Sequence, residues 1–328
     1  MIRLPYNGPT TKEKSIKAIS LRKLFFTLLL FCSITIIYMY IRPAYSAVYK
    51  PPTPTENKKS HEKEENSDIF QAFHDCFLPK LETITESYRK FWYEFANVTK
   101  DCDNLKEYNS LDIQAAKNKD EVKYVVFPKN NNEPLTMVTL GIGRDIRAEL
   151  RLKAMYPNIA FYGADPGVAV NKDLYESTLG GKFYNYAVSG QNGIHISKIF
   201  LERNFKVDAT EHIRADYFFR KILNKNRIDI LWIDIEQNEY GILEQIHQNG
   251  KLDQVGVKIC QMNVEFHKDV FGNSDAEMQK FYDFVFKVLE DKKYILLKPK
   301  HATYMDIIYI RAFIVNVADS ECTDLYIK

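Results

Sequence analysis

Apolar runs alternate with helical spacing along residues 131–328, and this pattern predicts an open α/β sheet. Strand candidates occur at 135–140, 158–164, 182–188, 228–233 and 255–265, and the run at 228–233 is almost continuously apolar, as is typical of a buried parallel strand. Helical spacing follows at 145–156, 240–248 and 274–288. Strands that alternate with helices favour a mostly parallel sheet with right-handed crossovers.

The end of the chain breaks this alternation. Residues 294–297 and 307–315 are two more strand candidates, and only nine residues separate them. A parallel crossover needs about a dozen residues or more, so these two strands must pair as an antiparallel hairpin. A Rossmann-like sheet that ends in such a hairpin resembles S-adenosylmethionine-dependent methyltransferases more than dinucleotide dehydrogenases.

Before the sheet, the pattern is helical. Apolar side chains recur at spacings of three and four after Pro79, which predicts an amphipathic helix; they are Leu81, Ile84, Tyr88, Phe91 and Phe95, with Trp92 beside them. We read residues 68–130 as a helical N-terminal cap on the domain formed by 131–328.

Residues 24–41 are 18 positions without a charge, and as a helix they would span about 27 Å, close to the thickness of a membrane core. Basic residues cluster before this segment, which predicts a cytosolic tail at 1–23 and a signal-anchor at 24–41. The rest of a type II membrane protein would then lie in the lumen of the Golgi or another secretory-pathway compartment. A signal peptide cleaved near residues 44–46 is the alternative, although its apolar region is normally only about 7–15 residues long.

Residues 42–67 read as a disordered stem, because 50–66 contain no aliphatic or aromatic side chain. Outside the membrane segment, four cysteines permit two disulfides in an oxidising lumen. Proximity in sequence favours Cys76–Cys102 and Cys260–Cys322, and separate buried thiols are the alternative. Asn97 begins a glycosylation sequon, which fits a luminal glycoprotein.

The charge pattern excludes one class of partner. The chain has 45 basic and 43 acidic residues, and its basic excess lies in the first 41 positions. The remainder lacks the clustered Lys and Arg of a nucleic-acid-binding surface, so no nucleic-acid partner is expected.

The carboxyl ends of parallel strands are where open sheets bind ligands. Asp165 closes the second strand 24 residues beyond Gly141, an interval that suits a carboxylate accepting hydrogen bonds from a ribose. Small residues that end the third strand could flank an adenine, although a simple turn is the alternative at each position. The candidate cofactor residues are Gly141, Gly143, Asp165, Pro166, Ala187, Val188 and Ser189.

Acidic residues on the fourth and fifth strands are the sharpest chemical signal. Alternation places Asp234 and Glu236 on one side of the fourth strand, and Glu265 and His267 on one side of the fifth. Buried carboxylates are costly unless they are paired, protonated or bound to a cation, so these four residues are the catalytic candidates. A structural ion pair is the alternative. The four could supply a general base or hold a divalent cation, but no metal is assigned, because the other histidines lack metal-ligand spacing.

Residues 136–315 resemble the FkbM-type methyltransferase family, especially its membrane-anchored animal branch, through the segments TLGIGRD, GADPG, YAVSG, WIDIEQNE and NVEFH. The family pattern D-x-E-G-x-E is similar to Asp234, Glu236 and Glu239, with Gln237 at the glycine position.

The resemblance also covers the cofactor side. The family's E-P pair corresponds to Asp165 and Pro166. The first motif departs from the family, because Thr139 replaces an acid and Asp145 stands at the last glycine. Asp145 therefore joins the cofactor candidates.

The resemblance implies S-adenosylmethionine as cofactor and O-methylation, commonly of sugar hydroxyls. We therefore expect a luminal O-methyltransferase that acts on a glycan or small-molecule acceptor. A luminal Mn²⁺-dependent glycosyltransferase, with Asp234 and Glu236 under a sugar nucleotide, is one alternative. The terminal hairpin and the interval from Gly141 to Asp165 argue against it. A non-catalytic binding protein that retains the fold is the other alternative.

Overall fold

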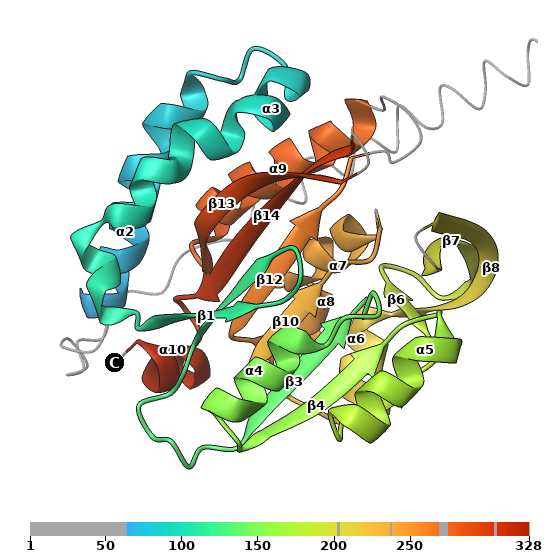
Figure 1. Cartoon of the computed structure of the whole chain (residues 1–328). Coiled ribbons are helices and arrows are strands. Elements are labelled where there is room, and N and C mark those ends of the chain that lie inside the picture. Colours follow the sequence, from blue (N-terminus) through green and yellow to red (C-terminus); the bar gives the residue numbers. More distant parts are fainter. Residues whose placement is uncertain (1–63, 202–203, 237, 269–274, 305–306, 328) are drawn as a thin grey trace, which may run out of the picture. The chain divides into compact units, whose positions relative to one another are not determined.

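The computed structural model describes residues 64–327 except 202–203, 237, 269–274 and 305–306 (Figure 1). The predicted tail, anchor and most of the stem, up to residue 63, lie outside the described residues. The helices are α2 (Glu64–Glu82), α3 (Tyr88–Thr99), α4 (Arg147–Met155), α5 (Val168–Asp173), α6 (Ala215–Tyr217), α7 (Glu239–Ile246), α8 (Lys251–Gln254), α9 (Asp275–Asp291) and α10 (Ser320–Tyr326). The strands are β1 (Ile113–Lys117), β2 (Val122–Val126), β3 (Leu135–Leu140), β4 (Ile159–Ala164), β5 (Lys182–Tyr184), β6 (Ala187–Ser189), β7 (Gly193–Leu201), β8 (Asn204–Arg214), β9 (Arg227–Ile228), β10 (Ile230–Ile233), β11 (Lys258–Ile259), β12 (Gln261–Phe266), β13 (Tyr294–Tyr304) and β14 (Ile307–Asn316).

The described residues contain the predicted mixed sheet. Its seven strands lie in the order β13-β14-β12-β10-β3-β4-β5, and only the pairs that include β14 are antiparallel. β3 and β10 are buried along their whole length, which explains their continuous apolar character. The Rossmann-like sheet with a C-terminal antiparallel hairpin is therefore confirmed.

The third predicted strand, 182–188, is divided in the structure. β5 joins the main sheet beside β4, but the Tyr186 N–H then bonds to the Tyr184 carbonyl at 3.0 Å and turns the chain. β6 pairs instead with β8, in a separate three-stranded sheet. The long β7–β8 hairpin of this second sheet projects beside β6 in Figure 1.

One face of the main sheet is covered by helices through aromatic packing. Phe266 of β12 contacts Phe281 and Phe284 of α9, with ring centroids 5.0 and 5.4 Å apart. Tyr240 of α7 lies 6.3 Å from the same ring. These contacts form part of one continuous hydrophobic core.

The other face of β12 carries polar residues that hold the β1–β2 hairpin. The side-chain amide of Gln261 bonds to the N–H and the carbonyl of Val126, and that of Asn263 bonds to the N–H and the carbonyl of Tyr124, all at 2.7–2.9 Å. Each amide therefore supplies one donor and one acceptor to the backbone of β2, as a neighbouring strand would. This hairpin corrects the helical reading of 68–130, since helical structure ends at Ser110 and 113–126 form strands.

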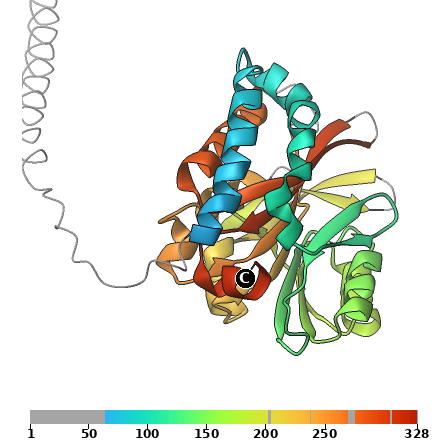
Figure 2. The same cartoon turned by 90° about the vertical axis from the view of Figure 1, so that its left-hand side faces the viewer.

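The single helix predicted after Pro79 is also two helices. α2 ends at Glu82, and α3 starts after Ser87, whose hydroxyl accepts the Lys90 N–H at 3.2 Å as an N-cap. Figure 2 shows α2 and α3 side by side on the part of the fold that holds α9. The apolar spacing still marks buried positions, because the two helices share one core face.

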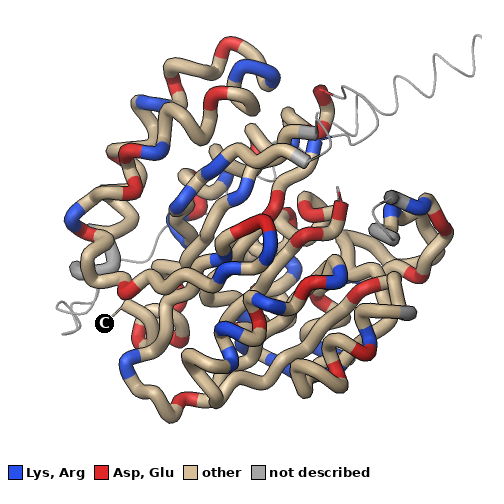
Figure 3. The backbone as a smooth tube through the Cα atoms, in the orientation of Figure 1, with Lys and Arg blue, Asp and Glu red and all other residues tan. Residues whose placement is uncertain are grey.

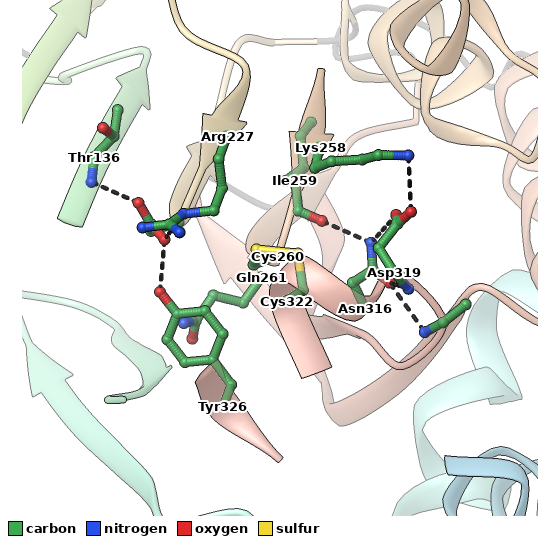
Figure 4. The surroundings of a disulfide bond; sticks show 12 residues. Thr136, Arg227, Lys258, Ile259, Cys260, Gln261, Asn316, Asp319, Cys322 and Tyr326 are labelled. Carbon is green, nitrogen blue, oxygen red and sulfur yellow. Dashed lines mark hydrogen bonds and ion pairs between the residues drawn. A yellow bond between two sulfur atoms is a disulfide. The ribbon is translucent and has the colours of Figure 1, made fainter. Parts of the chain in front are cut away.

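Both predicted disulfides are present. Cys76–Cys102 joins α2 to the turn after α3, and Cys260–Cys322 joins the start of β12 to α10. Figure 4 shows the second bridge among polar contacts, including the Tyr326 hydroxyl that donates to Asp229 at 2.8 Å. The C-terminal helix is thus fastened at the amino ends of the parallel strands.

Within the described ranges, none of the helices combines the length and the apolar character that membrane crossing requires. The predicted anchor at 24–41 stays a prediction, since it falls outside those ranges. Asn97 of the sequon is exposed on α3.

Candidate functional site

A cavity of about 750 Å³ opens at the carboxyl ends of β3, β4, β10 and β12. Parallel sheets bind ligands at this edge, and small-molecule sites commonly enclose about 300–1,000 Å³. Its wall includes most of the candidates from the sequence: Gly141, Gly143, Asp145, Asp165, Pro166, Ala187, Val188, Asp234, Glu236, Glu265 and His267.

Gly141 and Gly143 shape the turn after β3 for different reasons. Both have left-handed backbone angles, with φ of +78° and +59°. A Cβ atom at Gly141 would lie 1.8 Å from the backbone oxygen of Asp234, so this glycine lets the turn pack against the end of β10. A Cβ atom at Gly143 would meet nothing within 4 Å. Only Gly143 fits the expected close approach of backbone to ligand.

Asp165 follows β4 and holds the glycine turn in place. Its Oδ2 accepts the N–H of Ile142 at 2.8 Å, and its Oδ1 accepts the N–H of Gly167 at 2.6 Å. Burial raises the pKa of Asp165, and these hydrogen bonds offset only part of the rise. The Asn171 side chain and the Gly143 N–H also form hydrogen bonds with this carboxylate, so a ligand hydroxyl would share its oxygens with these donors.

Asp145 lines the cavity but is engaged by neighbouring groups. Its carboxylate forms two hydrogen bonds with the Arg147 guanidinium, at 2.8 and 2.6 Å, and accepts the Lys119 N–H at 3.1 Å. Burial alone would raise the pKa of Asp145, but Arg147 outweighs it and the pKa is lowered. Asp145 thus fastens the tip of the β1–β2 hairpin to the start of α4.

Ser189 is placed differently from its neighbours. Ala187 and Val188 line the cavity, whereas Ser189 is buried and outside the wall. Its hydroxyl lies 3.1 Å from Nδ1 of His212, whose Nε2 lies 2.7 Å from the Ser197 hydroxyl. This hydrogen-bonded chain occupies the side chain of Ser189, which corrects its inclusion among the cofactor candidates.

Asp234 and Glu236 follow β10 rather than lying in it. β10 ends at Ile233, and Glu236 has φ of +52°, so strand alternation is not what brings the two carboxylates together. Their side chains are 36% and 21% exposed, which leaves both accessible from the cavity. Burial and the nearby Glu265 raise the pKa of Asp234 well above its usual value, and burial also raises that of Glu236.

His267, directly after β12, is the centre of this cluster. Its Nδ1 lies 2.7 Å from Glu239 Oε1, and its Nε2 lies 3.3 Å from Glu265 Oε1, 3.9 Å from Asp234 Oδ1 and 3.8 Å from Glu236 Oε2. Burial alone would lower the pKa of His267, but the carboxylates, Glu239 foremost, raise it well above its usual value. The structure therefore brings the four catalytic candidates together.

Three charged residues that sequence patterns did not indicate complete the cluster. Arg311 Nε lies 2.6 Å from Glu265 Oε2 and 3.3 Å from Glu121 Oε2, and Lys123 Nζ lies 2.6 Å from Glu121 Oε1. Figure 3 shows acidic and basic segments adjoining at the tip of the β1–β2 hairpin. Burial alone would raise the pKa of Glu265, but His267 and Arg311 lower it. A single charge inside the apolar run 307–315 was the available signal for Arg311.

Glu149 of α4 is another residue that the patterns missed. It is 2% exposed, lines the cavity, and accepts a hydrogen bond from the Thr139 hydroxyl at 3.1 Å. The Tyr175 hydroxyl donates to Thr139 in turn, at 3.0 Å. Burial raises the pKa of Glu149 to about 7. Thr139 stands where the family pattern has an acid. In this chain the carboxyl group of Glu149, on α4, lies beside that position instead.

Residues 68–296 match the family of the methyltransferase FkbM domain. The chain belongs to the FkbM methyltransferase family. The match begins at α2 and so includes the helices and the β1–β2 hairpin, which the resemblance read from the sequence did not cover. The predicted family and its methyltransferase domain are confirmed, and the narrower membrane-anchored animal branch stays a prediction.

Other similarities of this FkbM methyltransferase are more distant. The uncharacterized protein C28H8.7 of Caenorhabditis elegans is 22% identical over 265 residues, which cover 79% of this chain and 81% of that protein. The M. capricolum TrmK structure with S-adenosyl-homocysteine is 13% identical, with a TM-score of 0.31, over 56% of this chain and 63% of that one. The Aeropyrum pernix fibrillarin structure with S-adenosyl-L-methionine is 13% identical, with a TM-score of 0.31, over 56% of this chain and 68% of that one. The chain thus spans slightly less than two thirds of the TrmK chain.

Proposed function

We propose that the protein is an S-adenosylmethionine-dependent O-methyltransferase that acts on a carbohydrate hydroxyl in a secretory-pathway lumen. S-adenosylmethionine supplies an electrophilic methyl group when it is bound. The observation that carries the proposal is the hydrogen bond from the Ile142 N–H in the glycine turn to the Asp165 carboxylate. A carboxylate at this position disfavours the phosphate of a nucleotide and is compatible with a nucleoside.

The glycine turn does not favour the binding of an anion. In phosphate-binding loops, backbone N–H groups point at the phosphate. Here the Ile142 N–H is bonded to the Asp165 carboxylate at 2.8 Å, and that carboxylate would repel a phosphate. S-adenosylmethionine carries no phosphate and has a ribose whose hydroxyls can donate to Asp165. A sugar nucleotide, which the glycosyltransferase alternative needs, fits this turn poorly.

The opposite end of the cavity suits the acceptor. Methyl transfer is an in-line displacement, so the protein mainly has to orient the acceptor and remove its proton. Asp234 and Glu236 present carboxylate oxygens that can accept a hydrogen bond from a hydroxyl, and His267 is held beside them. Several carboxylates in one wall also suit a sugar, whose neighbouring hydroxyls need several acceptors.

The luminal setting is supported by the two disulfides, which persist in oxidising compartments and are rare in the cytosol of mesophiles. With an uncleaved anchor at 24–41, the full-length protein should resist carbonate extraction, and Asn97 should be open to glycosylation. A soluble secreted product that begins near residue 47 would reject the anchor.

Calorimetry of the full chain tests the cofactor. S-adenosylmethionine and S-adenosylhomocysteine should each give a saturable heat, and UDP-sugars should give none when they are titrated into the chain already equilibrated with Mn²⁺. Binding of only the sugar nucleotide would reject the proposal. If no ligand gave heat, the alternative of a non-catalytic protein that retains the fold would be favoured.

A further inference from the structure

Three possible metal-ligand atoms converge on one point of the cavity wall. Asp234, Glu236 and His267 each offer one such atom, and these atoms all lie within 4.8 Å of one another. The imidazole nitrogen is 3.9 and 3.8 Å from the two carboxylates, too far for hydrogen bonds. Two ligands that each bind one ion at about 2.0–2.3 Å lie roughly 3–4.5 Å apart. The three atoms are therefore nearly at the spacing of a shared cation.

A second observation concerns the imidazole itself. Nδ1 of His267 lies 2.7 Å from Oε1 of Glu239, and both side chains are almost completely buried, at 4% and 0% exposure. Metal sites use this carboxylate–imidazole pair to fix the tautomer and the orientation of a ligating histidine. With its proton on Nδ1 and a cation in place of the Nε2 proton, His267 would present Nε2 to Asp234 and Glu236, beside Glu265, whose Oε1 lies 3.3 Å from Nε2.

Two of the nearby basic side chains, Arg311 and Lys123, have close carboxylate partners, and Lys198 on the cavity wall lowers the pKa of Glu236 by its charge. Arg311 Nε lies 2.6 Å from Glu265, and Lys123 Nζ lies 2.6 Å from Glu121. Asp234 and Glu236 add two further carboxylates to the same wall, and concentrated buried negative charge is costly unless a cation balances it. A divalent ion would balance both charges at once.

We propose that Asp234, Glu236 and His267 bind a divalent cation of the Mn²⁺ class, and that this cation also binds the acceptor hydroxyl. Two carboxylates favour a hard ion, and one imidazole favours Mn²⁺ over Mg²⁺ or Ca²⁺. Three protein ligands leave coordination positions open for the acceptor. The inference rests on the proposed methyl transfer and assigns to the same site how the acceptor is held.

The cation would lower the pKa of the acceptor hydroxyl, as divalent ions do for bound water. The hydroxyl proton is released to the buffer. An oxygen electron pair then forms the new bond to the methyl carbon, while the carbon–sulfur bond breaks and its electrons return to sulfur. The products are a methyl ether and neutral S-adenosylhomocysteine, so charge and atoms balance.

MnCl₂ alone, titrated into the metal-free full chain, tests the site, with free Mn²⁺ measured by electron paramagnetic resonance. One Mn²⁺ per chain should bind. Glu236→Gln should weaken binding at least tenfold, and Glu239→Gln should weaken it about 10–100-fold, as loss of the group that orients a ligand does. The matched control is Glu244→Gln, which removes an exposed carboxylate from the same helix as Glu239 and should bind as the wild type does.

Calorimetry with S-adenosylhomocysteine separates this inference from the proposed function. Cofactor binding should be unchanged in all three variants. A wild-type chain that binds S-adenosylhomocysteine but no stoichiometric Mn²⁺ would overturn the metal site and leave the proposed function standing. Equal Mn²⁺ affinity in the wild type, Glu236→Gln and Glu239→Gln would also overturn it. Bound Mn²⁺ without any cofactor binding would instead reject the proposed function.

Discussion

Arg311 on β14 lies directly opposite Glu265 on β12, and its Nε donates to Oε2 of Glu265 at 2.6 Å. The antiparallel register that joins the C-terminal hairpin to the sheet therefore also builds the cavity wall. The final strand contributes a charge to the site as well as two antiparallel pairings to the sheet.

Replacing Arg311 should test this pairing. Arg311→Met leaves Glu265 buried without its guanidinium, and breaking a buried pair costs about 3–5 kcal/mol. The melting temperature should fall, and Glu265→Gln added to Arg311→Met should recover most of the loss. Chemical denaturation of the single and double variants measures this. A single variant as stable as the wild type would show that the pair contributes little.

Asp165→Asn should weaken cofactor binding at least tenfold. The amide keeps the shape of the side chain but has one acceptor oxygen, so it cannot accept the N–H groups of both Ile142 and Gly167. Calorimetry with S-adenosylhomocysteine measures the affinity, and Asp283→Asn, an exposed change on α9, is the control. Equal affinity in Asp165→Asn and the wild type would remove Asp165 from the cofactor site.

Glu149 should make stability depend on pH. Its pKa rises from 4.5 to about 7 on folding, so between these values the folded state binds a proton that the unfolded state lacks. The stabilisation is present below about pH 4.5 and is lost as the pH rises through 7, up to about 3.5 kcal/mol at 1.4 kcal/mol per unit.

Glu149→Gln stays neutral at every pH, so it should be more stable than the wild type at pH 8 and similar at pH 5. Urea denaturation at both values checks this. Glu244→Gln, on the exposed face of α7, should show no such difference. Parallel pH profiles for the wild type and Glu149→Gln would contradict the assignment.

Asp234→Asn should abolish methyl transfer while costing little stability. The amide preserves shape, and Asp234 is 36% exposed to the cavity, with its closest cationic contact at 3.9 Å. Activity and a melting curve on one variant decide the matter. A destabilised protein with near-normal turnover per folded molecule would instead make Asp234 part of a structural ion pair.

The alternation of strands with helices and the terminal hairpin could be predicted from sequence, because hydrophobic period and connection length determine them. Asp234, Glu236, Glu265 and His267 were found because acidic residues stand out at the ends of apolar strands. The predicted placement of Glu265 and His267 on one side was right. Asp234 and Glu236 also lie together, but they follow the end of β10, and the left-handed backbone of Glu236 rather than strand alternation brings them there.

What sequence could not reveal depends on long-range contacts. Gln261 and Asn263 look like isolated polar residues in a strand, and only the folded chain shows that they hold the β1–β2 hairpin. Glu121 and Lys123 therefore carried no signal of their own. Ser189 was wrongly assigned to the cofactor because its hydrogen-bond partner, His212, lies on β8. The residues of the β7–β8 hairpin alternate with polar side chains, and nothing in that pattern indicated that the hairpin would pack against Ser189.

The attachment of the β1–β2 hairpin sets how small a working fragment can be. A fragment cut before residue 131 would keep every strand of the main sheet. It would, however, leave the Gln261 and Asn263 amides without their four partners and remove Glu121 and Lys123 from the cavity wall. Such a fragment would keep the sheet but lack part of the cavity wall. Deletion variants and domain fusions should therefore retain the segment before the sheet, which behaves as part of the enzyme rather than as a spacer.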